Sequence, residues 1–235
     1  MTERLGRLAC QTGKRMSTEN QHQRKGRPVE SRGYFDDVAE KWDVLRQSFF
    51  SERVREKALA AADVRAGQVA ADIGAGTGFI TEALVRKGVH VIAVDQSEAM
   101  LAEMKEKFRE VPNVEYRVGE AEHLPIQDAG LDNAFANMYL HHVERPSIAI
   151  KEMVRLLKPE GRLIVTDLEE HSYEFLRDEH HDRWLGFRLD EVRQWFREAG
   201  LKDVIIGGIT EQCCTSSCDG GQRASISIFL ASGQK

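Results

Sequence analysis

Residues 69–95 read VAADIGAGTGFITEALVRKGVHVIAVD and carry the strongest fold signal in the chain. Two short β-rich runs, Val69–Ile73 and Val89–Val94, flank a helical stretch at Phe79–Lys87. Glycines at positions 74, 76 and 78 follow the first run, where they allow a tight turn and the close approach of a ligand. This order of strand, loop, helix and strand predicts a right-handed βαβ unit and therefore a parallel sheet.

The same alternation extends through the rest of the chain. Further strands are predicted at Val114–Val118, Asn133–Asn137 and Leu163–Leu168, with helices at Glu98–Phe108 and Ser147–Leu157. A helix near Leu189–Ala199 precedes two strands, Asp203–Ile206 and Ala224–Leu230, which no helix separates and which predict a closing hairpin. We expect an α/β, Rossmann-like, seven-stranded, mostly parallel sheet with a C-terminal antiparallel hairpin and helices on both faces.

The N-terminal region divides into two parts. Residues 1–33 show no apolar period and carry eight Lys or Arg against three acidic residues, which predicts a disordered basic tail. Apolar side chains then recur at helical spacing from Tyr34 through Val38 and Trp42 to Phe49, which predicts one amphipathic helix. A second helix is expected from Glu52 to Ala62. One folded domain is therefore expected over residues 34–235.

Composition excludes several classes of protein. The 235 residues are 41% hydrophobic and 30% charged, as is typical of a soluble globular chain. No apolar run approaches the roughly 20 residues of a membrane helix, and the first 20 residues lack the apolar core of a secretory signal. We expect a cytoplasmic protein. A net charge of −5 argues against nucleic acid as the main partner.

Polar side chains follow the predicted strands at the edge where open α/β sheets bind ligands. Asp72 and Asp95 end the first two strands, and Glu120 follows the third. The loop spacing is G-x-G-x-G, with Phe79 where a dinucleotide fold has Gly or Ala, and no Lys-Ser or Lys-Thr follows as in a P-loop. Acidic residues around such a cleft would repel a pyrophosphate and attract a cation.

Five motifs together resemble one known family. VAADIGAGTGFI, HVIAVD, GEAEHLP, LHHV and LLKPEGRLIVTD occur in the order found in class I S-adenosylmethionine-dependent methyltransferases. Among these, the chain is most similar to the small group that includes quinone-biosynthesis methyltransferases. The resemblance covers residues 34–230 and identifies the domain at 34–235 as a methyltransferase domain.

The resemblance implies a set of cofactor-binding residues. Asp72 and the loop of Gly74, Ala75, Gly76 and Gly78 would hold the methionine part, and Asp95 would bind the ribose hydroxyls. The adenine would lie between Gln96 and Met100 and meet Glu120 and Ala121 at its amino edge, while Asn137 and Met138 would line the methyl channel. The first helix would be a lid carrying Tyr34, Phe35 and Trp42, although core packing explains these aromatic residues equally well.

Histidines are the candidate catalytic residues. Methyl transfer from a sulfonium requires in-line positioning, and it requires a base only when the acceptor atom is protonated. His141 and His142 follow the fourth strand and could act as base or substrate ligand, or could only cap or pack. His171, His180 and His181 lie on a predicted helical insert, where helix surface is the alternative to a substrate pocket.

Three cysteines crowd into one predicted loop, at Cys213, Cys214 and Cys218. If the final hairpin forms, the strand before this loop runs parallel to the main sheet and brings the thiols to the cofactor edge. Thiolates there could bind zinc or another soft metal or a metalloid. The alternative is a loop of small residues.

The sequence therefore predicts a methyltransferase that converts S-adenosylmethionine to S-adenosylhomocysteine. Its acceptor would be a small molecule, either a quinone-like or phenol-like ring or a thiol, metalloid or metal-bound species. A non-catalytic S-adenosylmethionine-binding or metal-sensing protein is the main alternative. A nicotinamide oxidoreductase is a third, disfavoured by Phe79.

Overall fold

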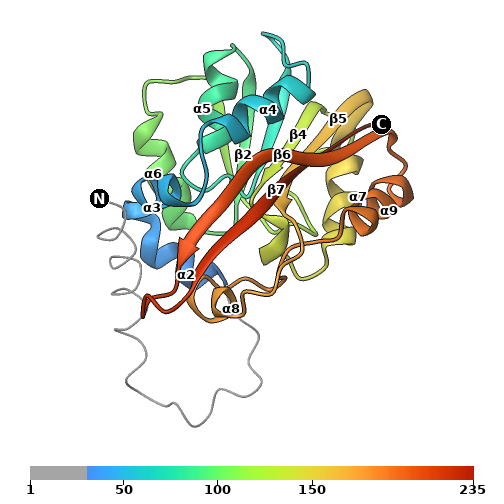
Figure 1. Cartoon of the computed structure of the whole chain (residues 1–235). Helices are drawn as coiled ribbons and strands as arrows, with labels where there is room; N and C mark the ends of the chain where they lie inside the picture. The colour runs from blue at the N-terminus through green and yellow to red at the C-terminus, as the bar shows by residue number, and fades with distance from the viewer. Residues whose placement is uncertain (1–30) are drawn as a thin grey trace.

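The computed structural model describes residues 31–235, which form a seven-stranded sheet flanked by helices (Figure 1). The strand order is β3-β2-β1-β4-β5-β7-β6. Strands β1 to β5 are parallel, and β7 is antiparallel to both of its neighbours. This confirms the predicted fold class. The strands are β1 (Val69–Ile73), β2 (His90–Asp95), β3 (Val114–Val118), β4 (Leu131–Asn137), β5 (Leu157–Leu168), β6 (Lys202–Ser216) and β7 (Arg223–Gln234).

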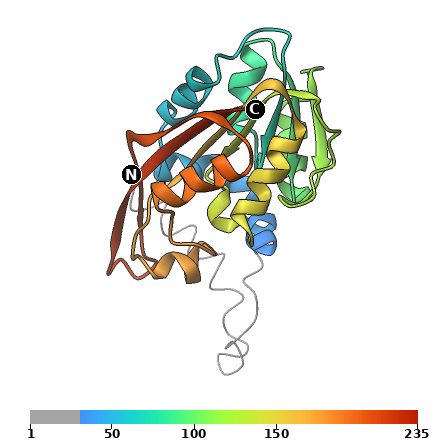
Figure 2. The same cartoon turned by 90° about the vertical axis from the view of Figure 1, so that its right-hand side faces the viewer.

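Helices cover both faces of the sheet. They are α2 (Ser31–Val38), α3 (Trp42–Phe49), α4 (Arg53–Ala61), α5 (Phe79–Arg86), α6 (Glu98–Lys107), α7 (Pro146–Leu156), α8 (Phe175–Glu179) and α9 (Leu189–Glu198), with short 3-10 turns η1 (Ala39–Lys41) and η2 (Leu140–His142). Helices α7 and α9 lie side by side, in yellow and orange in Figure 2, and pack with one apolar cluster. Helices α4 and α5 pack with a second cluster.

Strand β1 shows why the sheet is buried on both sides. Successive side chains of a strand point to opposite faces, so Ala71 and Ile73 join the cluster beneath α7 and α9. Ala70 joins the cluster beneath α4 and α5. All three are inaccessible to solvent. The near-continuous apolar character of this strand is therefore the signature of a parallel sheet covered by helices.

The N-terminal prediction needs two corrections. The predicted basic tail lies outside the described residues except for positions 31–33, which form the first turn of α2. The predicted single helix is broken at η1 into α2 and α3. The break lets α2 contact α6 while α3 contacts β6.

The C-terminal hairpin forms as expected but is longer. Because β6 is antiparallel to β7, which is antiparallel to β5, β6 runs in the direction of the main sheet. Its pairing continues through Cys213 opposite Ile226 and Cys214 opposite Ser225. The predicted cysteine loop is therefore wrong for these two residues, which are part of a strand. Hydrogen bonding to β7 extends the ladder beyond the apolar run that the sequence displays.

Candidate active site

The glycine loop connects β1 to α5 at the carboxyl edge of the sheet. Gly74, Gly76 and Gly78 have φ angles of 69°, 53° and 93°, a region that favours glycine. A Cβ on Gly74 would lie 2.2 Å from Cδ2 of Tyr139, and one on Gly78 would lie 2.6 Å from Cε2 of Phe108. The loop therefore requires glycine at both positions, for backbone conformation and for space.

Asp72 lies beneath this loop and supports it. Its Oδ2 accepts hydrogen bonds from the Thr81 backbone N–H at 2.9 Å and from the Thr81 hydroxyl at 2.7 Å. Burial raises the pKa of Asp72 to about 6 despite these bonds. The side chain is not among those that line the cavity at the sheet edge. Its observed contacts anchor the first turn of α5.

Asp95 ends β2 and faces the cavity. Its carboxylate accepts the Gly76 N–H at 2.8 Å and the Ser97 N–H at 2.9 Å, which fixes the glycine loop against the start of α6. Burial raises the pKa of Asp95. Ser97 caps α6 by accepting the Met100 N–H at 3.0 Å, and its hydroxyl donates to Asp36 of α2 at 2.5 Å.

Aromatic residues of α2 and α3 cover the cavity. The ring centroids of Phe35 and Trp42 are 5.4 Å apart, and those of Trp42 and Phe49 are 6.1 Å apart. Phe35 also meets His142 at 5.0 Å, and Phe49 meets His180 at 5.4 Å. All of these side chains line the cavity. The N-terminal segment is therefore in a lid position and is not only packed into a core.

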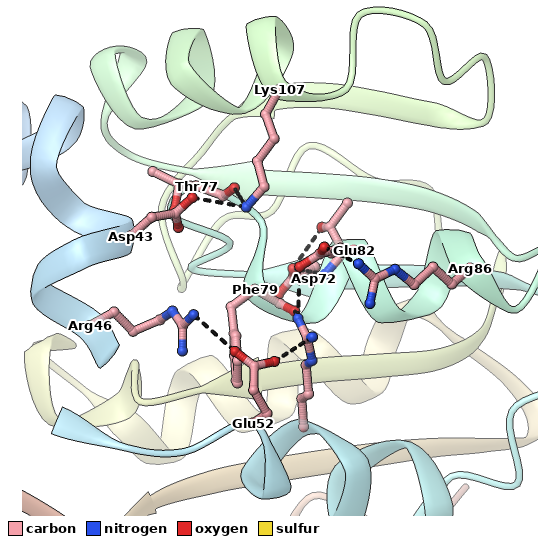
Figure 3. Close-up of polar contacts among 11 residues, drawn as sticks. Asp43, Arg46, Glu52, Asp72, Thr77, Phe79, Glu82, Arg86 and Lys107 are labelled. Carbon is pink, nitrogen blue, oxygen red and sulfur yellow. Dashed lines mark hydrogen bonds and ion pairs between the residues drawn. The ribbon is translucent and has the colours of Figure 1, made fainter. Parts of the chain in front are cut away.

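A polar latch joins this lid to the glycine loop (Figure 3). The Thr77 hydroxyl donates to Asp43 of α3 at 2.6 Å, and Lys107 of α6 pairs with the same carboxylate at 3.0 Å. Burial raises the pKa of Asp43, but the bonds from Thr77 and Lys107 outweigh it and leave the pKa below its ordinary value. The lid is thus hydrogen-bonded to the loop that it covers.

Two histidines, His141 and His142, also line the cavity. His141 Nδ1 lies 2.6 Å from Oδ1 of Asp167, whose other oxygen accepts the backbone N–H groups of Tyr139 and Leu140. Burial lowers the pKa of His141, but the carboxylates of Asp167 and Asp182 raise it to about 9. His141 is therefore an imidazolium at neutral pH.

His142 has the opposite character. Burial and the charge of His141 hold its pKa well below 6.5, so it is neutral at physiological pH. Its Nδ1 lies 3.2 Å from the backbone oxygen of His181, which assigns the Nδ1 proton to that contact and leaves Nε2 as an acceptor. Adjacent histidines thus carry different charges, as in acid–base sites whose members have separated pKa values.

The three cysteines do not converge as the metal-site prediction requires. Cys213 is buried and lines the cavity, whereas Cys214 and Cys218 are not among its lining residues. Cys213 and Cys214 are neighbours on one strand and so point to opposite faces. Within residues 31–235, one group of three potential ligands has its atoms within 4.8 Å of one another, and it consists of His141, His142 and Asp182. Cys213, Cys214 and Cys218 therefore do not form such a group within the described residues, and the findings do not support the predicted metal at this segment.

Most predicted cofactor residues meet in one cavity. Its lining includes Gly74, Ala75, Gly76, Asp95, Gln96, Met100, Asn137 and Met138. Gly78, Ala121 and Glu120 do not line the cavity. Gly78 caps α5, Ala121 is buried in the core, and Glu120 is exposed. The predicted helical insert is shorter than expected, because α8 ends at Glu179. His180 follows α8 and lines the cavity.

Four further residues define the site and were not identified from the sequence. They are Arg46, Tyr139, Asp167 and Asp182. Asp167 had a detectable signal, because it is an acid near the carboxyl end of a predicted strand, as Asp72 and Asp95 are. Asp182 and Arg46 have no such signal in the sequence, because only tertiary packing brings α3 and the segment after α8 to the sheet edge.

The seven-stranded sheet and the cavity at its carboxyl edge define a Rossmann-like α/β domain. Residues 71–165 match the family described as "Methyltransferase domain". The chain is 37% identical over 144 residues to a demethylmenaquinone methyltransferase of Paenarthrobacter aurescens, covering 60% of this chain and 56% of that one. It is 31% identical over 173 residues to a demethylmenaquinone methyltransferase of Thermobifida fusca, covering 72% and 71%.

These similarities assign the family. The chain belongs to the S-adenosylmethionine-dependent methyltransferases of class I. A Haemonchus contortus phosphoethanolamine N-methyltransferase 2, solved with phosphomonomethylethanolamine and S-adenosylhomocysteine, shares the fold with a TM-score of 0.70 and 16% identity. That comparison covers 86% of this chain and 58% of the other. The chain spans 56% to 62% of the length of three demethylmenaquinone methyltransferases that it matches.

Within residues 31–235, no helix combines the length and the apolar character that crossing a membrane demands.

Proposed function

We propose that the protein transfers the methyl group of S-adenosylmethionine to a small-molecule acceptor and releases S-adenosylhomocysteine. One observation carries this proposal. The glycine loop and Asp95 line the same cavity as His141 and His142, together with the aromatic residues of the lid. Such an arrangement can align a cofactor and an acceptor while excluding water.

The chain's residues fit the cofactor in charge and shape. Asp95 would accept the ribose hydroxyls through lone pairs left by its two backbone bonds. The three glycines of the loop have no side chains to obstruct a ligand, and a Cβ on Gly76 would meet only Trp42 of the lid, at 3.4 Å. Asp72 would act indirectly by supporting the loop. The remaining proposed contacts are Gln96 and Met100 with the adenine, Glu120 and Ala121 with its amino edge, and Asn137 and Met138 beside the sulfonium.

The histidines would prepare the acceptor. S-adenosylmethionine supplies the methyl group as an electrophile. His142, which is neutral, would accept a proton from an O–H, N–H or S–H acceptor through Nε2. His141, held as an imidazolium by Asp167, would stabilise the negative charge that the acceptor develops.

An aromatic acceptor, quinone-like or phenol-like, suits the lining best. Phe35, Trp42, Phe49 and Tyr139 give the cavity an aromatic lining, and six of the relatives are named demethylmenaquinone methyltransferases. Cys213 favours a second candidate, a soft acceptor such as a thiol, metalloid or metal-bound species, because its buried thiol lines the same cavity.

The test is the formation of S-adenosylhomocysteine with a panel of quinols, phenols, thiols and metalloids. We expect turnover with at least one quinol or phenol, and about a 100-fold loss in the His142→Ala variant. The Cys214→Ser variant is the control, because Cys214 does not line the cavity, and it should keep full activity. Tight cofactor binding without turnover on any acceptor would instead favour a non-catalytic sensor.

A further inference from the structure

Three potential metal ligands meet in the cavity. His141, His142 and Asp182 all line it, and each offers a ligand atom that lies within 4.8 Å of the other two. Nε2 of His141 lies 3.9 Å from Oδ1 of Asp182, which is too far for a hydrogen bond. Atoms that bind one zinc ion at about 2.1 Å lie no more than about 4.2 Å apart. The distance between His141 and Asp182 meets this limit, and a small side-chain rotation brings the whole group within it.

Both histidines are held at the ring nitrogen that a metal would not use. His141 belongs to η2, directly after β4, and its Nδ1 lies 2.6 Å from Oδ1 of Asp167 in β5. Nδ1 of His142 lies 3.2 Å from the backbone oxygen of His181. Histidine ligands of metals commonly donate their second ring N–H to a carboxylate or a backbone carbonyl, which fixes the tautomer and leaves the other nitrogen for the ion. The two histidines therefore have the support that metal ligands require.

Backbone hydrogen bonds place Asp182 against these histidines. The N–H of Asp182 donates to the carbonyl oxygen of Leu176 in α8 at 3.3 Å. The N–H groups of Arg183 and Trp184 donate to the carbonyl oxygen of His141 at 2.9 Å and 3.0 Å. The segment that carries Asp182 is thus fixed to η2 on one flank and to α8 on the other. The position of the carboxylate beside the histidines is therefore built into the fold.

The charge and the donor atoms of this group favour a cation. The side chain of Asp182 is 5% exposed, and that of Asp167 is inaccessible to solvent. A buried carboxylate is costly unless hydrogen bonds or a cation compensate for its charge. Two imidazoles and one carboxylate are the donor set of many catalytic zinc and non-haem iron sites, in which further coordination positions stay open. Because the group lines a cavity, a ligand there could reach an open position.

We propose that His141, His142 and Asp182 form a binding site for a first-row divalent metal ion, and that this ion binds the oxygen of the methyl acceptor. The second part rests on the proposed function, which supplies the acceptor. The ion replaces the proton on Nε2 of His141, so the imidazolium described above is the metal-free state. His142 is then a ligand, and the ion takes over the task of the base.

The ion would act on a quinol or phenol as a Lewis acid. It lowers the pKa of the bound hydroxyl, whose proton passes to water. The oxygen then forms a bond to the methyl carbon while the carbon–sulfur bond of S-adenosylmethionine breaks. The products are the methylated acceptor, S-adenosylhomocysteine and one proton.

Metal binding can be measured without cofactor or acceptor. The full chain is freed of metal with a chelator, and Zn²⁺ is titrated calorimetrically into wild type, Asp182→Asn and Asp178→Asn. Asp178 is the matched control, because it is an exposed acid of α8 that does not line the cavity. We expect Asp182→Asn to weaken Zn²⁺ binding about 100-fold or more, since loss of an outer partner alone costs about 10- to 100-fold. Asp178→Asn should match wild type.

Cobalt distinguishes these ligands from the cysteines. With Co²⁺ in place of Zn²⁺, the visible spectrum of wild type should lack a thiolate-to-cobalt charge-transfer band. The double variant Cys214→Ser/Cys218→Ser should bind both ions as wild type does. Addition of catechol, a phenolic probe, should change the cobalt spectrum, because its oxygen enters the coordination sphere.

Several results would overturn the inference. No Zn²⁺ binding by wild type, equal affinity of wild type and Asp182→Asn, or a thiolate band would each refute the site. If Asp182→Asn does not fold, His142→Ala takes its place with the same expected loss. A cobalt spectrum that catechol leaves unchanged refutes the acceptor role. Failure to bind S-adenosylhomocysteine would refute the proposed function alone, because the Zn²⁺ titration requires neither cofactor nor acceptor.

Discussion

At the scale of single residues, the site depends on how burial and neighbours set charge. His141 and His142 are adjacent in sequence, yet they make different contacts. His141 lies 2.6 Å from a carboxylate oxygen of Asp167 and 3.9 Å from one of Asp182, whereas Nδ1 of His142 lies 3.2 Å from the backbone oxygen of His181. From the sequence, the pair could be recognised as candidates but not distinguished. The distinction comes from Asp167, at the end of the neighbouring strand, and Asp182, after α8, and both contacts depend on tertiary structure.

The Asp167→Asn substitution tests this electrostatic assignment. Without the carboxylate, the pKa of His141 should fall from about 9 toward its ordinary value, because Asp167 is the main group that raises it. If the imidazolium is required, the alkaline limb of the kcat/KM profile should move to lower pH by the same amount. Unaltered S-adenosylhomocysteine affinity and circular dichroism would show that the fold is intact. An unchanged alkaline limb would contradict the role of His141.

Asp72 provides a prediction about stability. Its folded pKa of about 6 lies above the ordinary value of 3.8, so protonation favours the folded state. The stability it contributes is fully present below pH 3.8 and is lost as the pH rises through 6. A pKa difference of this size between the folded and unfolded states corresponds to about 3 kcal/mol. We compare the free energies of unfolding of Asp72→Asn and wild type, measured with urea on the cofactor-free protein. The variant's free energy of unfolding, relative to that of wild type, should rise by up to about 3 kcal/mol between pH 4 and pH 8. A constant difference would argue against a buried, titrating Asp72.

At the scale of elements, the lid is the feature that the sequence describes least well. Its apolar spacing correctly indicates helix, and its aromatic residues do face the cavity. The break at η1 has no signal in the spacing of the apolar residues, because two tertiary contacts determine it. Asp36 of α2 binds Ser97 at the start of α6, and Asp43 of α3 binds Thr77 in the glycine loop.

The latch predicts a specific effect of the Asp43→Ala substitution. Loss of the bonds to Thr77 and Lys107 should weaken S-adenosylhomocysteine binding about three- to tenfold, a modest value because both charged side chains are partly exposed. Glu40→Ala, an exposed position on the same segment, should have no effect. Fluorescence titration of Trp42, which lines the cavity, can report both affinities. Equal behaviour of the two variants would mean that the latch does not stabilise the closed lid.

At the scale of the whole molecule, the alternation of apolar runs and helical stretches predicts the sheet well, and the glycine loop identifies its ligand-binding edge. The positions of Asp95, Asn137 and His141 at that edge follow from parallel strands alone. The cysteines were misplaced because strand pairing with β7 extends β6 past Ile206, and pairing partners are not visible in local sequence. Residues beyond the sheet edge, such as Arg46, are assembled by packing and could not be placed in advance.

The most direct test is a calorimetric titration of S-adenosylhomocysteine and of NAD into wild type and Asp95→Ala. The glycine loop and the carboxylate at position 95 should bind S-adenosylhomocysteine in wild type, with at least about a tenfold loss in the variant, and NAD should give no heat of binding. Equal affinity of both proteins for S-adenosylhomocysteine, or binding of NAD in its place, would contradict the assignment of this cavity.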